Sequence, residues 1–373
     1  MKKMKVLTIV GTRPEIIRLS RVIPALDKCF DHSLIHTGQN YDYELNQIFF
    51  DDLNLRLPDV FLDCAQEGMT AGQTIGKIIS EVDILLAKNQ PDALLLLGDT
   101  NSCLASIPAK RHKIPIFHME AGNRCFDVNV PEEINRKLVD HTSDINLCYS
   151  QIARSYLLRE GVRPDTIIVT GSPMKEVLEY NSEKINNSEI LKKLQLKNQK
   201  YFVVSAHREE NIENPQNFNT LINSLNSLAD NYGYPIVVTV HPRTRKKIEN
   251  GNFRLHKNIR LIKPIAFSDY ISLQKNCYVV LSDSGTISEE ASILKFKALN
   301  IRSTHERPEA MENSSVMLVG LGIERISQGL KILEQTVIPN DVTDYLPNDV
   351  STKVSKIILS YTDFVNKYIW QKF

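Results

Sequence analysis

The sequence of 373 residues predicts an α/β protein with two doubly wound parallel sheets. Short apolar runs alternate along the chain with longer stretches of helical periodicity, which is the pattern of strand and crossover helix. The alternation is interrupted after residue 170 by a Gly-Ser-Pro turn and then restarts. The length also favours two domains, because a single hydrophobic core rarely grows beyond about 250–300 residues. We therefore expect domains at 1–170 and 171–351.

In the first domain, each predicted strand leads into the next helix through a polar turn. The predicted strands cover residues 5–10, 34–37, 92–97, 114–117, 145–148 and 166–169. The main helices between them cover residues 14–28, 69–89, 100–112 and 132–140. Because parallel strands end at the same edge of a sheet, the residues that follow these strands should lie together.

The second domain repeats the pattern. Its predicted strands cover residues 201–205, 235–240, 259–262, 278–281 and 297–301, and its helices cover 215–231, 268–276, 286–295 and 323–335. Two such sheets joined near residue 170 would leave an interdomain cleft between their carboxyl edges. The amphipathic tail, residues 352–373, has mixed charge, so we expect it to pack back on the first domain. A helix lying on a membrane would instead concentrate Lys and Arg on its polar face.

Composition excludes several classes of protein. Lys+Arg 45 against Asp+Glu 44 leaves a net charge of +1, so neither nucleic acid nor an anionic membrane is expected as a partner. No apolar run approaches the ~18 residues of a membrane span, and the run behind the basic start, residues 6–10, is too short for an export signal. Six scattered cysteines fit a reducing compartment. We expect a cytoplasmic protein without membrane insertion.

Three acidic residues follow apolar runs of the first domain. Asp99 comes after the strand at 92–97, Glu120 after the strand at 114–117, and Glu132 opens the helix at 132–140 beside an Arg-bearing segment. A carboxylate in a poorly hydrated cleft has a raised proton affinity and can act as acid or base near neutral pH. These acids are therefore candidates for proton transfer.

Two turns have the residues of an anion site. Gly11, Thr12 and Arg13 open the first helix, and Ser284, Gly285 and Thr286 open a helix of the second domain, with Glu290 one turn further on. Free N–H groups at a helix N-terminus bind phosphate, and a carboxylate nearby can accept from a ribose diol. Either turn alone could be an ordinary cap, but two that face one cleft suggest a diphosphate.

Two histidines, His207 and His241, end adjacent strands of the second domain, each close to an arginine. Because His-Glu-x-x-His and Cys/His spacings are absent, we expect no metal. A Gly-x-Gly-x-x-Gly turn and a P-loop are absent too, so neither a dinucleotide cofactor nor P-loop phosphoryl transfer is expected. The combination suits a site that moves a proton on carbon while an anionic leaving group is held.

These motifs resemble, in order over residues 5 to about 320, the non-hydrolysing UDP-N-acetylglucosamine 2-epimerases. The resemblance lies in residues 11–15, 37–39, 98–100, 118–122, 131–136, 206–211, 283–285 with 289–290, and 306–310. It implies a GT-B-like fold of two Rossmann-like domains and inversion at C2 of a UDP-N-acetylhexosamine, through elimination of UDP to a 2-acetamidoglycal and re-addition. The family also suggests a homodimer.

Carried over by motif, Asp99, Glu120 and Glu132 are the catalytic carboxylates, and His207 assists the departing diphosphate. The implied substrate-binding residues are Arg13, Arg18, His241, Tyr270, Ser284, Gly285, Thr286 and Glu290. Tyr270 would stack on the uracil ring. Arg18 stands where many members have Lys, a change that keeps the charge but alters its reach.

Two segments depart from the common pattern. Residues 40–43 read Asn-Tyr-Asp-Tyr where His-Arg-Glu-Met is common, which leaves allosteric activation by UDP-N-acetylglucosamine open. Residues 40–46 and 300–307 are similar to a capsule-type branch that makes UDP-N-acetyl-L-fucosamine from a 6-deoxy talose derivative. Two rival classes stay open as well, a GT-B glycosyltransferase and a UDP-sugar-binding protein without catalysis.

Overall fold

The computed structural model describes residues 3–38, 47–66, 68–240, 242–251, 253–335 and 341–372. The chain divides into two compact units, unit 1 (Met1–Tyr180 and Asp344–Phe373) and unit 2 (Asn181–Thr343). The first unit thus extends to Tyr180 rather than to residue 170, and it takes up the chain again from Asp344.

Unit 1 is built on a parallel sheet that its described residues form from seven strands in the order β3-β2-β1-β4-β5-β6-β7. The strands are β1 (Lys5–Val10), β2 (Asp31–His36), β3 (Val60–Phe61), β4 (Ala93–Leu97), β5 (Ile116–Ala121), β6 (Ile145–Cys148) and β7 (Ile167–Val169). The strand order reverses between β1 and β4, and ligands of doubly wound sheets bind at this switch point.

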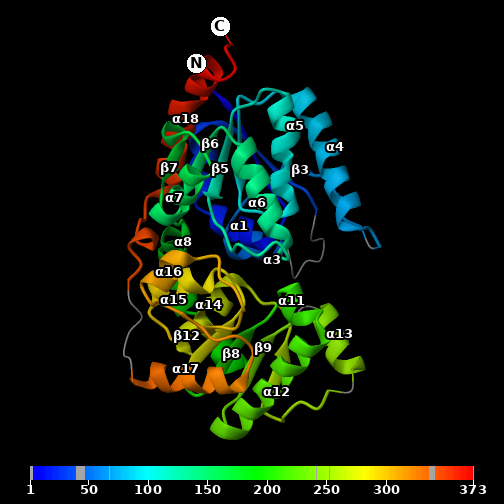
Figure 1. Ribbon diagram of the computed structural model, residues 1–373, viewed down its shortest axis with the longest axis vertical. Helices are drawn as coiled ribbons and strands as arrows, with labels where there is room; N and C mark the ends of the chain where they lie inside the picture. Colours follow the sequence, from blue (N-terminus) through cyan, green and yellow to red (C-terminus); the bar gives the residue numbers. More distant parts are fainter. Residues whose placement is uncertain are drawn as a thin grey trace. The chain divides into compact units, whose positions relative to one another are not determined.

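Helices cover both faces of this sheet. They are α1 (Arg13–Leu19), α2 (Val22–Cys29), α3 (Gln47–Asp52), α4 (Ala71–Asn89), η2 (Asn101–Ala105), α5 (Ser106–Arg111), α6 (Pro131–Thr142), α7 (Gln151–Arg159), η3 (Pro164–Thr166), α8 (Met174–Tyr180) and α18 (Val350–Tyr368). Apolar residues of α4, η2, α5 and α6 pack together on one face of the strands, and Figure 1 shows the three α-helices side by side.

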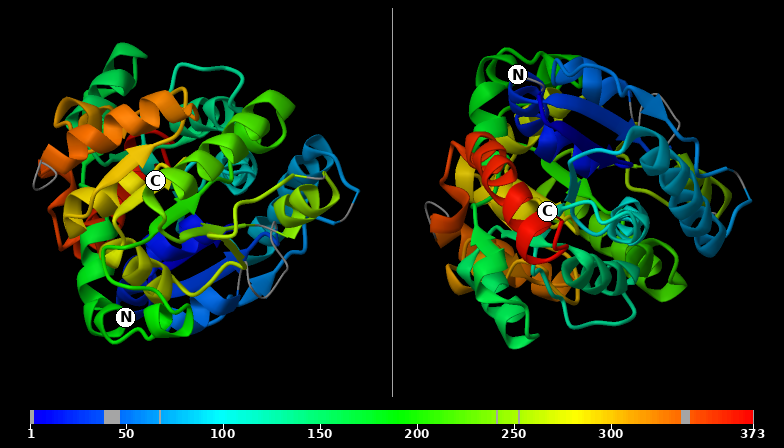
Figure 2. Two further views of the ribbon diagram at one scale, coloured as in Figure 1. Left: turned by 90° about the horizontal axis from the view of Figure 1, so that it is seen from below. Right: turned by 90° about the horizontal axis from the view of Figure 1, so that it is seen from above.

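The C-terminal helix α18 lies against α2, and Figure 2 (right) shows it in red beside the blue N-terminal segment. The backbone N–H of Ser351 at its start donates to Glu176 Oε2 over 2.9 Å. At its far end Trp370 lies with its ring 5.1 Å from Lys110 Nζ. No helix among the described residues is both long and apolar enough to cross a bilayer.

Two predicted boundaries differ from those observed. The helix expected over residues 14–28 is interrupted between α1 and α2. Pro24 explains the break, because its ring has no N–H to donate to the carbonyl of residue 20 and clashes with it. Strand β5 extends to Ala121, so Glu120 belongs to the strand instead of following it.

Unit 2 contains a second parallel sheet, whose described residues form six strands in the order β10-β9-β8-β11-β12-β13. The strands are β8 (Phe202–Ser205), β9 (Ile236–Thr239), β10 (Ile259–Ile262), β11 (Val279–Ser282), β12 (Ala298–Asn300) and β13 (Met317–Leu318). The order reverses between β8 and β11. The sequence did not predict β13. The two parallel sheets confirm the predicted fold class.

The helices of unit 2 again lie on both faces. They are α9 (Ser182–Asn186), α10 (Ile190–Lys193), α11 (Glu209–Ile212), α12 (Pro215–Tyr232), α13 (Pro242–Asn250), α14 (Phe267–Asn276), α15 (Ile287–Leu294), α16 (Pro308–Glu312) and α17 (Ile323–Gln335), with η4 (Thr343–Tyr345) at the return to unit 1. One core joins α12 and α17 to the sheet, and another joins α14 and α15 to it.

Candidate functional site

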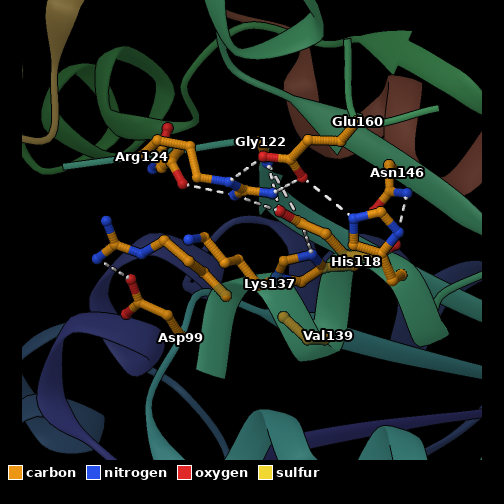
Figure 3. Close-up of polar contacts among 12 residues, drawn as sticks. Asp99, His118, Gly122, Arg124, Lys137, Val139, Asn146 and Glu160 are labelled. Atoms are coloured by element: carbon orange, nitrogen blue, oxygen red, sulfur yellow. Dashed lines mark hydrogen bonds and ion pairs between the residues drawn. The ribbon is translucent and has the colours of Figure 1, made fainter. Parts of the chain in front are cut away.

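Asp99 follows β4 at the switch point of the first sheet and is held by α6 (Figure 3). Arg136 Nη2 donates to Asp99 Oδ2 over 2.6 Å, and Asn135 Nδ2 donates to the Asp99 backbone carbonyl over 3.0 Å. Arg136 also donates from Nη1 to Glu133 Oε2 over 3.1 Å. A single guanidinium therefore positions two carboxylates at this edge of the sheet.

Glu120 lies at the end of β5 in a backbone conformation unusual for a residue with a side chain. Its φ is +67°, and the pairing with β6 shifts register between Met119 and Ala121. Such a bulge redirects a side chain. The positive φ costs about 1–2 kcal/mol for any residue other than glycine. Arg18 Nη1 donates to Glu120 Oε2 over 2.5 Å, and both side chains are almost completely buried. The structure thus pairs Arg18 with Glu120.

Glu132 and Glu133 occupy the first turn of α6 but have different environments. Glu132 is half-buried, whereas Glu133 is 1% exposed. Glu133 Oε2 accepts from the backbone N–H of Cys125 over 3.1 Å in addition to its bond with Arg136. The Pro-Glu-Glu motif gave no signal of which acid would be buried, because that depends on how α6 packs on the loop before it.

Glu15 is a buried acid in the first turn of α1. Its Oε2 accepts from the backbone N–H groups of Gly11 and Thr12 over 2.7 and 2.6 Å, and its Oε1 accepts from Thr100 Oγ1 over 2.7 Å. Burial raises the pKa of Glu15 to about 7, although the surrounding donors favour the ionised form. The Thr-x-x-Glu spacing of a capping box was the available signal.

Glu15 also changes the interpretation of the first anion site. The carboxylate already accepts from the two N–H groups that precede α1, which were expected to face a phosphate. Arg13 lies beside this turn, with its guanidinium carbon 5.7 Å from the centre of the Phe49 ring. Any anion bound here would meet Arg13 next to a protein carboxyl group.

Behind β5, four buried or partly buried side chains form a continuous series of hydrogen bonds and ion pairs, which we call the His118 chain: His118, Asp140, Arg124 and Glu160 (Figure 3). His118 and Arg124 belong to the motif around Glu120. Asp140 and Glu160 come from α6 and the end of α7, and nothing in the sequence marked them as partners.

In unit 2, the carboxylate of Asp283 joins the loops that follow β8 and β11. It accepts from the backbone N–H groups of His207 and Arg208 over 2.9 and 3.0 Å, and from Asn211 Nδ2 over 3.0 Å. Burial raises the pKa of the Asp283 carboxyl, and these donors oppose the rise. His207 is therefore held at the switch point of the second sheet through its backbone.

The turn before α15 carries the predicted hydroxyl groups. Ser284 Oγ lies 2.9 Å from Thr286 Oγ1, and the backbone N–H of Thr286 donates to Ser284 Oγ over 3.3 Å. A Cβ added at Gly285 would lie 3.5 Å from Glu306 Oε2, and Arg208 Nη2 donates to that oxygen over 3.1 Å. The turn is thus short, polar and close to a guanidinium.

The two remaining predicted contacts of unit 2 lie on helices. Glu290 is buried in α15, where its Oε2 accepts from Gln274 Nε2 over 2.8 Å. Tyr270 lies on α14, half-buried against the core. His241 lies outside the described residues, as do residues 40–46 of the departing loop. Among the described residues, no group of three or more His, Cys, Asp and Glu side chains could hold a metal ion.

The fold and these two sheet edges define a two-domain α/β enzyme of the nucleotide-binding type. Residues 25–359 match the family model of UDP-N-acetylglucosamine 2-epimerase, and the chain belongs to this family, whose members are isomerases acting on a UDP-sugar. The predicted family membership is confirmed.

Similar proteins include two solved structures and one more distant relative. A UDP-N-acetylglucosamine 2-epimerase from Rickettsia bellii has 48% identity and a TM-score of 0.92, with 99% of this chain and 100% of that chain covered. The Methanocaldococcus jannaschii enzyme in complex with UDP-GlcNAc and UDP has 33% identity and a TM-score of 0.89, with 96% and 100% covered. A Pseudomonas aeruginosa relative, named UDP-2,3-diacetamido-2,3-dideoxy-D-glucuronate 2-epimerase, is 31% identical, with 95% and 99% covered.

Proposed function

We propose that the protein interconverts UDP-N-acetylglucosamine and UDP-N-acetylmannosamine by inverting C2. The observation that carries the proposal is the pair Asp99 and Glu120 at neighbouring strand ends, each against a guanidinium group, that of Arg136 or Arg18. Further support comes from the Methanocaldococcus jannaschii relative, which is described in complex with UDP-GlcNAc and UDP.

The reaction proceeds by anti elimination and re-addition. A carboxylate takes the proton from C2, the C–H electron pair forms the C1=C2 bond, and the C1–O bond breaks with its electrons leaving on UDP. The product of this half-reaction is a 2-acetamidoglycal. Return of the UDP oxygen to C1, with protonation of C2 on the opposite face, gives the epimer. Asp99, Glu120 and Glu132 are the acids and bases of these steps.

The nucleotide is held mainly by the second sheet edge. His207 and the turn at Ser284, Gly285 and Thr286 stabilise the negative charge that develops on the diphosphate, because N–H and O–H donors at a helix N-terminus favour anions. Glu290 and Tyr270 contact the nucleoside. Arg13, Arg18 and His241 complete the proposed set on the substrate.

Deuterium exchange tests this reaction directly. The purified protein is incubated with UDP-N-acetylglucosamine in deuterated water without an acceptor, and the C2 proton is followed by NMR. An epimerase replaces that proton with deuterium. A GT-B glycosyltransferase or a UDP-sugar-binding protein leaves it in place, and that result would reject the proposal.

Variants of the three acids identify the groups that move the proton. Asp99→Asn, Glu120→Gln and Glu132→Gln should each reduce exchange and turnover by about 10²–10⁴-fold, which is the usual contribution of a general acid or base, with UDP binding retained. Asp92→Asn is the matched control. Asp92 lies before the opposite end of β4 and accepts from the Lys5 backbone N–H over 2.7 Å, so this variant should keep its activity. Near-normal rates in all three site variants would refute the assignment.

The identity of the sugar has a second candidate, the talose derivative of the capsule-type branch. This candidate rests on the similarity of residues 40–46 and 300–307 to that branch. The Pseudomonas aeruginosa relative is named for a UDP-sugar other than N-acetylglucosamine, which is a different sugar again. An NMR assay with UDP-N-acetylglucosamine and UDP-2-acetamido-2,6-dideoxy-L-talose side by side decides between them. Faster conversion of the talose derivative would make the protein a UDP-N-acetyl-L-fucosamine synthase.

We also infer that the enzyme works as a homodimer in the cytoplasm. Ile134 and Leu138, one turn apart on α6, and Ile107 on α5 expose large apolar side chains on unit 1, as an interface between two copies would require. Sedimentation equilibrium should give twice the mass of one chain. The mass of a single chain would contradict the dimer.

A further inference from the structure

The His118 chain connects a buried imidazole to the turn that carries Asp99. His118 Nε2 lies 2.9 Å from the Gly98 carbonyl oxygen, and His118 Nδ1 lies 2.9 Å from Asp140 Oδ1. The residue is 1% exposed, so water cannot replace either partner. Because a carbonyl oxygen can only accept, Nε2 is the donor of the hydrogen bond to Gly98.

The side of the His118 ring that faces Asp140 is held just as firmly. Asp140 Oδ2 accepts from Arg124 Nη1 over 2.7 Å and from the Gly122 backbone N–H over 3.2 Å. Arg124 donates from Nε and Nη2 to the two oxygens of Glu160 over 2.8 and 2.6 Å, a bidentate pair visible in Figure 3. Such a pair has a defined geometry, which fixes Asp140 and therefore the plane of the ring.

The side of the His118 ring that faces Gly98 determines the direction of one peptide. Gly98 has φ +74°, and its backbone N–H donates to the Met119 carbonyl over 3.0 Å. Its carbonyl is the one that His118 binds, and the same peptide unit contains the N–H of Asp99. Two hydrogen bonds from β5 thus hold the residue immediately before Asp99. This arrangement is independent of Arg136, which holds the Asp99 side chain.

We propose that His118 is a positioning residue of the epimerase reaction. It orients the peptide between Gly98 and Asp99 and so the direction in which the Asp99 carboxylate leaves the sheet. The inference rests on the proposed function in one respect, the role of Asp99 in proton transfer. A residue that only stabilised the core would support folding without controlling the rate of the folded enzyme.

Two amide substitutions separate these roles, because each keeps one of the two contacts. In His118→Gln the amide nitrogen occupies the position of Nε2 and can still donate to Gly98. In His118→Asn it occupies the position of Nδ1 and can donate only to Asp140. Both variants bury an amide and remove the ring, so their losses of stability should be similar.

The expected result is a difference in kcat. The Asn variant should lose about 10²-fold in kcat, the scale on which small displacements of catalytic groups act, while KM changes little. The Gln variant should retain most of the wild-type kcat. Each kcat is divided by the fraction of molecules that are folded, which urea unfolding of the same variant provides. Equal kcat values in the two variants would overturn the proposal.

A second readout does not depend on turnover. The Asp99 amide shares a peptide unit with the Gly98 carbonyl, so its ¹H–¹⁵N resonance reports the orientation of that peptide. This resonance should shift in His118→Asn and remain close to its wild-type position in His118→Gln. If the wild type failed to exchange the C2 proton, the proposed function would fail and this resonance would still test the positioning. An unmoved resonance in both variants would reject the positioning itself.

Discussion

Replacing Gly122 by alanine should destabilise unit 1 strongly, because the position combines an unusual backbone conformation with close packing. Gly122 lies between Glu120 and Arg124 with φ +82°. A Cβ built there would lie 2.4 Å from the Ala153 carbonyl oxygen and 3.1 Å from Leu157 Cγ. The first of these atoms belongs to the backbone of α7, which cannot move aside as a flexible side chain can.

The magnitude follows from two contributions. A side chain in the left-handed region costs about 1–2 kcal/mol. Forcing extra volume into a packed interior costs roughly a further 1–3 kcal/mol. The free energy of unfolding should therefore fall by about 2–5 kcal/mol in Gly122→Ala, the sum of the two contributions.

Gly161→Ala is the matched control for the conformational contribution. Gly161 has φ +84°, almost the same as Gly122, but no atom lies within 4 Å of its added Cβ. Its free energy of unfolding should therefore fall by only about 1–2 kcal/mol. The difference between the two variants isolates the contact with α7.

Urea unfolding followed by tryptophan fluorescence is the appropriate assay. Trp370 is the only tryptophan of the chain and belongs to unit 1, as do both glycines. Because the turn connects Glu120 with the His118 chain, kcat should also fall in Gly122→Ala but not in Gly161→Ala. Equal losses of stability in the two variants would refute the reasoning from close packing.

Two further predictions concern other parts of the site. The pKa of Glu15 rises from 4.5 to about 7 on folding, so its contribution to stability is complete below about pH 4.5 and is lost as the pH rises through 7, by about 3 kcal/mol in total. The side chain in Glu15→Gln cannot ionise, so the free energy of unfolding of unit 1, measured in urea from about pH 5 to about pH 8, should depend less on pH than in wild type. An unchanged slope would contradict the raised pKa of Glu15. In unit 2, Ser284→Ala combined with Glu290→Ala should weaken UDP binding about tenfold or more in calorimetric titration, because each removes a hydrogen-bonding group. Unchanged affinity would exclude these residues from the nucleotide site.

The positions of the candidate acids along the strands could largely be predicted from the sequence. Asp99 follows a run of four leucines, and a parallel strand presents the residue at its end to the carboxyl edge of the sheet. Glu120 was expected just beyond its strand and instead lies in a bulge within β5 with a positive φ. A bulge depends on the pairing partner, so the local sequence of one strand does not reveal it.

The partners of these acids could not be predicted. Arg136 pairs with Asp99 across 37 positions of sequence, and Arg18 pairs with Glu120 across 102 positions. Such pairs exist only after distant segments have packed, and nothing in the periodicity of either segment specifies them. The same holds for Asp140 and Glu160 in the His118 chain.

Local sequence is enough to predict the alternation of strands and helices, the presence of two sheets, and the acids and hydroxyl groups at their edges. These features follow from apolar periodicity and turn residues over about ten positions of chain, which is the range of local propensity. The packing of distant segments determines which cation faces each acid, how Thr100 reaches Glu15, and how His118 reaches the Gly98 carbonyl. Those contacts require burial and the approach of segments far apart in the chain, and only the folded protein supplies both.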